Sequence, residues 1–300
     1  MSTRPCGAGA AKAVRSFAAA MGIARPTRVI VRGGRLFEPM HVMSSGTPVA
    51  PIVVSQYPGE TVRLTRVDSR SRGEVYRPVW LDEASHVVIA GFTVADSVGF
   101  GRITGGGNNR AEDFRFEGTR LGLGSKSKRG GLYITHSAGN VVRGNLFQSG
   151  TDSLTLVASD RNLIEGNRFV DAGHTTLALK CSNYNIVRGN TFANRVQKTV
   201  EIYDCSKSTM AWHGNGRFRT DTPRYGETRR NLVEGNTFTM TGRNERADSS
   251  PLMPTASSTP VRTVFCVAMY SRASPGRLSA CRCTPMRPRK TAAIASITTS

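Results

Sequence analysis

The chain has 300 residues, of which 38% are hydrophobic, 7% are aromatic and 31 are glycine. This composition supplies a core of small and β-branched side chains. No stretch of 18 apolar residues occurs, so we expect no membrane-spanning helix. The formal net charge of +20 favours a polyanionic partner and excludes a strongly cationic one. It does not distinguish acidic polysaccharide from nucleic acid or an anionic membrane surface.

The N-terminal segment, residues 1–24, is rich in alanine but is interrupted by Lys12 and Arg15. Such interruptions are not typical of the hydrophobic region of a secretory signal peptide, so no signal peptide is predicted. The spacing of Phe17 and Met21 instead predicts a short amphipathic helix. We expect this helix to cap the open end of the repeat domain that follows.

A repeat of 22 to 23 residues runs through the middle of the chain. Four similar octets, NVVRGNLF, NLIEGNRF, NIVRGNTF and NLVEGNTF, begin at Asn140, Asn162, Asn185 and Asn231. The last interval is twice as long as the others, and the sequence TMAWHGNGRF within it is interpreted as a degenerate intervening copy. Two further weak copies surround Gly91 and Gly118.

Each copy combines alternating apolar residues, a Gly-Asn pair and a phenylalanine. Alternation that ends at a glycine able to adopt positive φ predicts a strand, a tight turn and a second strand. A further strand precedes each copy, in GLYIT, SLTLV, TLALK and TVEIY. Three short strands per copy and no helix predict an all-β fold, a parallel β-helix solenoid whose equivalent residues stack about 4.8 Å apart. Two stacks are expected, a phenylalanine stack in the core and a ladder of turn amides formed by Asn145, Asn167, Asn190 and Asn236.

The repeat stops after Gly242 and the composition changes. We interpret residues 25–242 as a β-helix of about seven to nine coils. Residues 243–300 are basic, rich in Ser, Thr, Pro and Arg, and without periodicity. They are predicted to form an irregular tail of low order, which is either native or the product of a shifted reading frame.

The stretch VIVRGGRLFEPMHVMSSGTPVAPIVVSQYPGETVRL, residues 29–64, resembles the first coils of secreted bacterial proteins of the pectin-lyase-like superfamily. With the later copies, the resemblance covers roughly residues 25–242. It implies a right-handed parallel β-helix at an extracellular or cell-surface location. It also implies that the protein binds or degrades an acidic, uronate-containing polysaccharide, by β-elimination if it is a lyase. The alternative is a non-catalytic carbohydrate-binding or surface module. We expect a monomer, with only non-specific nucleic-acid binding.

One face of the solenoid is predicted to carry the site. On the strand that precedes each copy, residues between the inward ones point to solvent. Aromatic rings on such a face stack on sugar rings, and charged groups bind uronate carboxylates. The predicted substrate-binding residues are Trp80, Tyr133, Tyr203, Lys198 and Asp152.

The predicted catalytic residues are Lys180, His174 and Glu201. Lys180 or His174 would act as the general base that removes the proton α to a uronate carboxyl group. In the alginate and chondroitin lyase branch, a lysine before a repeat asparagine is paired with Arg-His one coil later. Lys180 in LALKCSNYN lies near that place, whereas Asp204-Cys205 stand where Arg-His is expected. The structural alternative is a Lys180–Glu201 ion pair on a solvated sheet.

Two further predictions concern metal and cysteine chemistry. No cofactor is required by the sequence, but Asp152, Glu201 and Asp204 offer the oxygen ligands that Ca²⁺ prefers. Cys181 and Cys205 fall in adjacent coils, either as buried thiols or as a disulfide. The glycine-rich stretch from Gly99 to Gly131 is interpreted as a long mobile loop that borders the groove.

Overall fold

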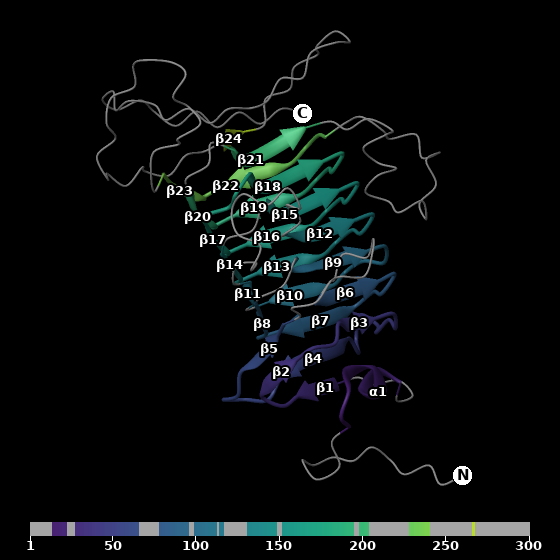
Figure 1. The fold of residues 1–300 in the computed structure, drawn as a ribbon. Coiled ribbons are helices and arrows are strands. Elements are labelled where there is room, and N and C mark those ends of the chain that lie inside the picture. Colours follow the sequence, from purple (N-terminus) through teal and green to yellow (C-terminus); the bar gives the residue numbers. More distant parts are fainter. Residues whose placement is uncertain are drawn as a thin grey trace, which may run out of the picture.

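Figure 1 shows a computed structural model of the chain, in which short strands are stacked coil upon coil. The structure describes residues 14–22, 28–65, 78–95, 99–112, 114–116, 131–148, 152–194, 198–203, 228–240 and 266–267. Nearly every element in these ranges is a strand, and strands of successive coils pair in parallel. The predicted all-β parallel β-helix is therefore confirmed.

Within the described residues the strands form three sheets. Sheet A contains β1 (Arg28–Val31), β4 (Ile52–Gln56), β7 (Val87–Ala90), β10 (Arg110–Glu112), β13 (Val141–Arg143), β16 (Leu163–Glu165), β19 (Ile186–Arg188), β22 (Leu232–Glu234) and the antiparallel β24 (Cys266–Val267). Sheet B contains β2 (Gly34–Leu36), β5 (Val62–Leu64), β8 (Thr93–Val94), β11 (Arg115–Phe116), β14 (Leu146–Gln148), β17 (Arg168–Val170), β20 (Thr191–Asn194) and β23 (Thr237–Met240). Sheet C contains β3 (Met40–Val42), β6 (Val79–Asp82), β9 (Gly101–Thr104), β12 (Leu132–Thr135), β15 (Asp152–Val157), β18 (Thr175–Lys180) and β21 (Lys198–Tyr203).

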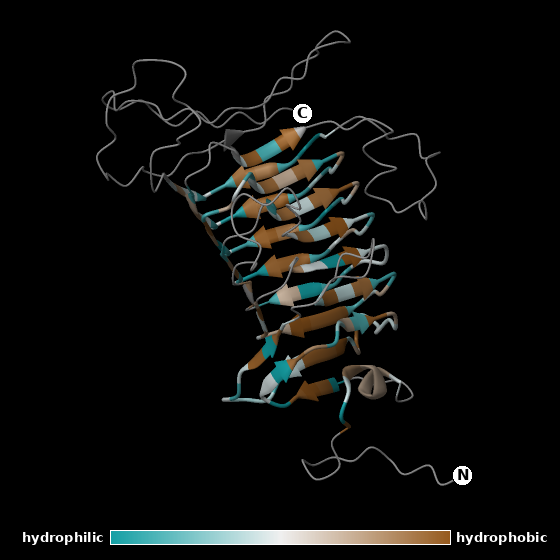
Figure 2. Ribbon diagram, viewed as in Figure 1, coloured by the Kyte–Doolittle hydropathy of each residue, from teal (hydrophilic) through white to brown (hydrophobic). Residues whose placement is uncertain are grey.

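The core is the space that the three sheets enclose. Figure 2 shows apolar residues concentrated on the strands and polar residues at the turns between them. Sheet B contributes the predicted phenylalanine stack. The rings of Phe147 and Phe169 lie 4.8 Å apart, as do those of Phe169 and Phe192, and Phe192 lies 4.9 Å from Phe238. Their interplanar angles of 3° to 8° follow from the coil spacing, because each ring sits directly on its equivalent in the next coil.

The Gly-Asn pairs form the turns between sheets A and B. Gly144, Gly166, Gly189 and Gly235 have φ values of 66°, 62°, 62° and 58°, a region in which glycine carries no steric penalty. Each glycine thereby directs the asparagine that follows it into the interior. The predicted strand, tight turn and strand are confirmed at these four glycines.

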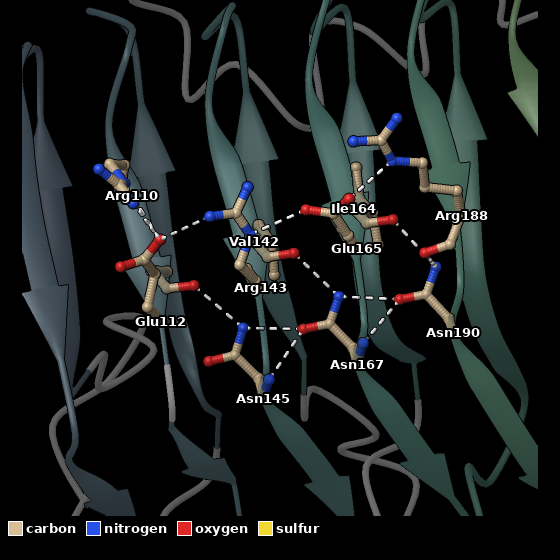
Figure 3. Close-up of polar contacts among 11 residues, drawn as sticks. Arg110, Glu112, Val142, Arg143, Asn145, Ile164, Glu165, Asn167, Arg188 and Asn190 are labelled. Carbon is tan, nitrogen blue, oxygen red and sulfur yellow. Dashed lines mark hydrogen bonds and ion pairs between the residues drawn. The ribbon is translucent and has the colours of Figure 1, made fainter.

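A ladder of buried amides runs through these turns (Figure 3). The Nδ2 group of Asn145 donates to Oδ1 of Asn167 at 2.9 Å, Asn167 donates to Asn190 at 2.9 Å, and Asn190 donates to Asn236 at 2.9 Å. Each accepting Oδ1 also receives the backbone N–H of the asparagine in the preceding coil. The ladder thus satisfies buried polar groups of both the side chains and the backbone.

A second amide ladder starts each repeat octet, at the turn between sheets C and A. Asn140 donates to Asn162 at 2.8 Å, Asn162 to Asn185 at 3.0 Å, and Asn185 to Asn231 at 2.9 Å. The sequence signal for this ladder is a serine three residues before each of the first three asparagines, at Ser137, Ser159 and Ser182.

The prediction of one mobile loop from Gly99 to Gly131 is wrong for the part that the structure describes, which holds β9, β10 and β11. Phe100 and Ile103 are buried in the core. Glycine is required here for close packing rather than mobility, because a Cβ atom at Gly101 would lie 2.6 Å from the carbonyl oxygen of Val79. Residues 117–130 lie outside the described residues.

The predicted intervening copy between the third and fourth octets is also wrong. Strand β19 pairs directly with β22, with Ile186 opposite Leu232, and Gly189 N–H donates to the carbonyl oxygen of Glu234. No coil separates them, so the long interval is one coil with an insertion. TMAWHGNGRF lies within this insertion and outside the described residues.

Helix α1 (Phe17–Met21) lies against the first coil, where Figure 1 shows it beside β1 and β3. The hydroxyl of Ser16 accepts a hydrogen bond from the backbone N–H of Ala19 and so caps the helix. Phe17 and Ala20 are buried against the core. The predicted capping helix is thus present, with its described part confined to five residues.

The amide ladder should dominate the stability of the solenoid. Replacing Asn167 by Ala leaves the backbone N–H of Asn145 without an acceptor in a buried turn. It also removes one of the two hydrogen bonds of the Asn145 Nδ2 group, which keeps the bond to the carbonyl oxygen of Ala111. We expect the free energy of unfolding to fall by about 2 kcal/mol or more, measured by urea denaturation. Thr191→Ala, at an exposed position of sheet B, is the control and should change it by less than about 0.5 kcal/mol. Equal effects of the two substitutions would contradict this role of the ladder.

Candidate functional site

The outer face of sheet C brings most of the predicted site residues onto one surface. The strand register aligns one outward residue of each successive coil in a single column, namely His41, Trp80, Arg102, Tyr133, Thr155, Ala178 and Glu201. A second column, two residues further along the strands, contains Asp82, Thr104, Thr135, Val157, Lys180 and Tyr203.

The expectation that this face is solvent-exposed throughout is wrong at its centre. Thr155 and Val157 have no exposed surface, and Ala178 is 1% exposed. Val157 packs with Cys181 and Ala158 in a hydrophobic cluster separate from the main core. Alternation along a strand predicts which residues turn away from the core, but not which of them are covered on the outside. The accessible parts of the face are therefore its margins.

At the N-terminal margin Trp80 is stacked on a histidine. The rings of Trp80 and His41 lie 4.1 Å apart with an interplanar angle of 8°. His41 Nε2 lies 3.4 Å from a carboxylate oxygen of Asp82. One face of the Trp80 ring is thus covered by a protein side chain, which reduces the ring surface available to a sugar.

Arg102 is a site residue that the sequence reasoning missed, because its strand had been assigned to a loop. It lies between Trp80 and Tyr133 in the first column and is only 6% exposed. Its Nε donates to the hydroxyl of Thr135 at 3.2 Å. Burial, and secondly the charge of Arg102, lower the pKa of His136 below its usual value. The available signal was the alternation in GRIT, which pairs in register with LYIT.

At the opposite margin Asp152, His174, Thr175 and Glu201 form one hydrogen-bonded group. Asp152 and Thr175 begin β15 and β18 and face each other in register. His174 Nδ1 lies 2.9 Å from Oδ1 of Asp152 and 3.2 Å from the hydroxyl of Thr175. The same hydroxyl donates to Oε2 of Glu201 at 2.8 Å. Three predicted site residues, Asp152, His174 and Glu201, are therefore brought together here.

This group determines the tautomer of His174. The Thr175 hydroxyl donates its only proton to Glu201, so it can only accept from the imidazole. The Asp152 carboxylate is likewise an acceptor, and both lie at Nδ1. Nδ1 must therefore carry a proton, and in the neutral imidazole the lone pair is then on Nε2. With a side chain that is 54% exposed, His174 presents this lone pair to the surroundings of the protein.

The structure does not bring Lys180 to this group. His174 precedes β18 and Lys180 is its last residue, so the two lie about 20 Å apart along an extended strand. Lys180 is opposite Val157 and Tyr203, whereas Glu201 is opposite Ala178. Lys180 and Glu201 are thus diagonal neighbours on adjacent strands, and the ion pair of the structural alternative stays a prediction. The side chains of Lys198 and Tyr203, and the whole of Asp204, lie outside the described residues.

Cys181 follows Lys180 and is disulfide-bonded. Cys205, its predicted partner, lies outside the described residues, so that pairing stays a prediction. Across the described ranges, no cluster of three or more His, Cys, Asp or Glu side chains is arranged to hold a metal ion. Nor does any helix in those ranges have the length and apolarity needed to cross a membrane.

Sheet A carries a different outer face, which contains a ladder of alternating charges (Figure 3). Glu165 accepts from Nε of Arg143 at 2.8 Å and from Nε of Arg188 at 2.7 Å. These two hydrogen bonds lower the pKa of Glu165 below its usual value, with the bond from Arg188 the larger cause. The ladder links successive coils through charge-assisted hydrogen bonds.

Comparison with known families is consistent with this geometry. Residues 65–251, well over half of the chain, match the family described as "Periplasmic copper-binding protein (NosD)". The matched region contains most of sheet C, including the Asp152–His174 pair. This match and the parallel sheets agree with a right-handed β-helix class, but they do not identify the pectin-lyase-like superfamily. No curated protein matches the chain.

The Glu165 pairs predict a specific pH dependence. Because the folded-state pKa is lowered, their stabilisation is complete above the usual pKa of 4.5 and is lost as pH falls through the lower folded value. Glu165→Gln should therefore reduce thermal stability at neutral pH, and this difference should shrink in acid. The control is Glu234→Gln, which lies at the same register position of sheet A two coils further along. A difference between wild type and Glu165→Gln that grows on acidification would contradict the assignment.

Proposed function

This chain belongs to the NosD family of periplasmic copper-binding proteins, and on that basis we propose that it is a non-catalytic binding module of the cell envelope, with His174 as its ligand-binding group. The observation that carries the proposal is the hydrogen-bonded group around His174. It holds the imidazole in one tautomer and leaves the Nε2 lone pair accessible. The β-helix of residues 25–242 would be the binding domain.

The disulfide at Cys181 supports an envelope location. Disulfides persist in oxidising compartments, including the bacterial periplasm, and are rare in the cytosol. The printed description of the family is also periplasmic. The two observations are independent, because one concerns a covalent bond of this chain and the other its sequence similarity.

A binding role agrees better with the geometry than β-elimination does. The two candidate bases, His174 and Lys180, are separated by the length of β18 and cannot act on one proton. Glu201 is engaged with the Thr175 hydroxyl and supports the imidazole indirectly. Asp204-Cys205 occupy the place of the Arg-His pair of the lyase branch. Within the part of the chain that the structure describes, the two candidate bases therefore do not converge on one substrate position.

Copper suits the donor that the structure offers. Imidazole nitrogen is a favoured copper ligand, and a metal-bound histidine usually donates its other N–H to a carboxylate. Asp152 stands in that relation to His174. The described residues do not add two further ligands beside it. His174 would therefore fill one coordination position of the metal, and the other positions would be open to water or to a group on another molecule. Calcium is a weaker candidate, because Asp152 and Glu201 already accept hydrogen bonds.

Acidic polysaccharide is the second candidate ligand, and Arg102 between Trp80 and Tyr133 favours it. A guanidinium group binds carboxylates and the flanking rings stack on sugars. The burial of Arg102 and the stacking of His41 on Trp80 restrict access to this region. The His174 group has no such restriction.

A copper titration tests the proposal directly. We expect Cu²⁺ binding, followed by calorimetry and by nitrogen hyperfine structure in electron paramagnetic resonance, to weaken at least about tenfold in His174→Asn. Asp152→Asn should weaken it about 10- to 100-fold, as other losses of an orienting carboxylate do. The matched control is His86→Asn, because asparagine tolerates the positive φ of 56° at that position.

Copper affinity that is unchanged in His174→Asn, or that falls equally in His86→Asn, would overturn the assignment of His174. Circular dichroism of each variant shows whether the fold is retained. Binding of Ca²⁺ with loss in Asp152→Asn but not in His174→Asn would instead favour the calcium site expected from the carboxylates.

A further inference from the structure

The outer face of sheet A carries aliphatic side chains that the solenoid core does not use. Strand alternation buries Val142, Ile164, Val187 and Val233 and turns the residue before each of them outward. In four successive coils that outward residue is aliphatic, which defines the apolar column of Val141, Leu163, Ile186 and Leu232. Leu232 is 43% exposed and the other three are partly exposed.

An outward sheet position facing only water is usually polar, because hydrophobic and polar residues then alternate along each strand. Here the alternation fails at the same position in every one of these coils. In the coil before Val141 the same position is occupied by Arg110. The two coils before that have Val88 and Val53 there, and both are also partly exposed. Aligned aliphatic side chains on an outer face indicate a surface that is covered in use.

The ion-pair column lies beside it, two residues further along each strand. It consists of Glu112, Arg143, Glu165, Arg188 and Glu234, so the sign of the charge alternates from coil to coil. The side chains of Arg143 and Arg188 are 44% and 46% exposed. Arg188 directs its Nε toward Glu165, and Glu234 makes no ion pair with the described residues. Donors and a carboxylate thus remain available on this surface.

We propose that this face of sheet A binds the same face of a second copy of the chain. The two copies would be related by a two-fold axis that runs parallel to the strands and passes between the coils of Glu165 and Arg188. Such an axis reverses the order of the coils and keeps each column in its place. The apolar columns then cover each other, with Leu163 opposite Ile186 of the partner subunit and Val141 opposite Leu232 of the partner subunit.

The alternation of charge and the extent of the apolar column together select this axis. It places Glu165 opposite Arg188 of the partner subunit, and Arg143 opposite Glu234 of the partner subunit. An axis between the coils of Arg143 and Glu165 would also oppose unlike charges, but it would set Arg110 against Ile186 of the partner subunit. An axis through the coil of Glu165 would instead oppose this residue to its own copy, which is repulsive. An axis along the solenoid would set the apolar column against the ion-pair column.

The same alternation argues against other occupants. A polyanion or a polycation laid along the solenoid would meet a like charge at every second coil, which disfavours binding. A reversed copy of this face is complementary at each of the four coils of the apolar column. The surface is thus matched to itself, which differs from the monomer expected from the sequence.

Sedimentation velocity over a dilution series tests the proposal. We expect a reversible dimer for the wild type, and a dissociation constant at least about tenfold higher for Leu163→Lys, which places a charge in the centre of the apolar column. The matched control is Leu146→Lys, an equally half-buried and outward leucine on sheet B. It should leave the dimer unchanged. If Leu163→Lys loses its β-sheet circular dichroism, Leu232→Lys, at the most exposed position of the column, replaces it.

A wild-type protein that sediments as a monomer at every concentration would overturn the proposal. So would equal weakening of the dimer by Leu163→Lys and Leu146→Lys in folded proteins, because the association would then not use sheet A. Neither result depends on copper, so this test is independent of the His174 assignment.

Discussion

The structure depends on hydrogen bonds between equivalent residues of successive coils. Each ladder asparagine satisfies two groups of the preceding coil, its backbone N–H and its side-chain amide. Without this acceptor the backbone N–H would be unpaired, and the side-chain amide would keep only its hydrogen bond to a backbone carbonyl oxygen. A one-residue slip of any strand would break the ladder and turn its core side chains outward. The ladders therefore lock the register, and the register decides which side chains meet on the outer faces.

The two outer faces show what a locked register permits. On sheet A it aligns charges of opposite sign, and Glu165 is held between Arg143 and Arg188. On sheet C it sets Asp152 beside Thr175, and the residue before Thr175 is His174. Neither contact involves residues that are close in sequence. The repeat that appears purely structural is thus what positions the chemically useful groups.

The extent of sequence prediction follows from the same repeat. Asn145, Asn167, Asn190 and Asn236 could be aligned because stacking makes equal residues recur at equal intervals. Arg102 could not, because its coil lacks the Gly-Asn pair and follows a different spacing. The burial of Thr155 and Val157 was missed because alternation describes the inner side of a strand only. The contact of Thr175 with Glu201 is diagonal between strands, so register alone does not predict it.

The central claim is that cross-coil contacts hold His174 with its proton on Nδ1 and its lone pair on the exposed Nε2. The most direct measurement is the pair of ¹⁵N imidazole chemical shifts of His174, in protein labelled at histidine and assigned with His174→Asn. We expect a protonated Nδ1 and an unprotonated Nε2 in the neutral form of the imidazole. A proton on Nε2, or rapid averaging between both nitrogens as in free histidine, would contradict it.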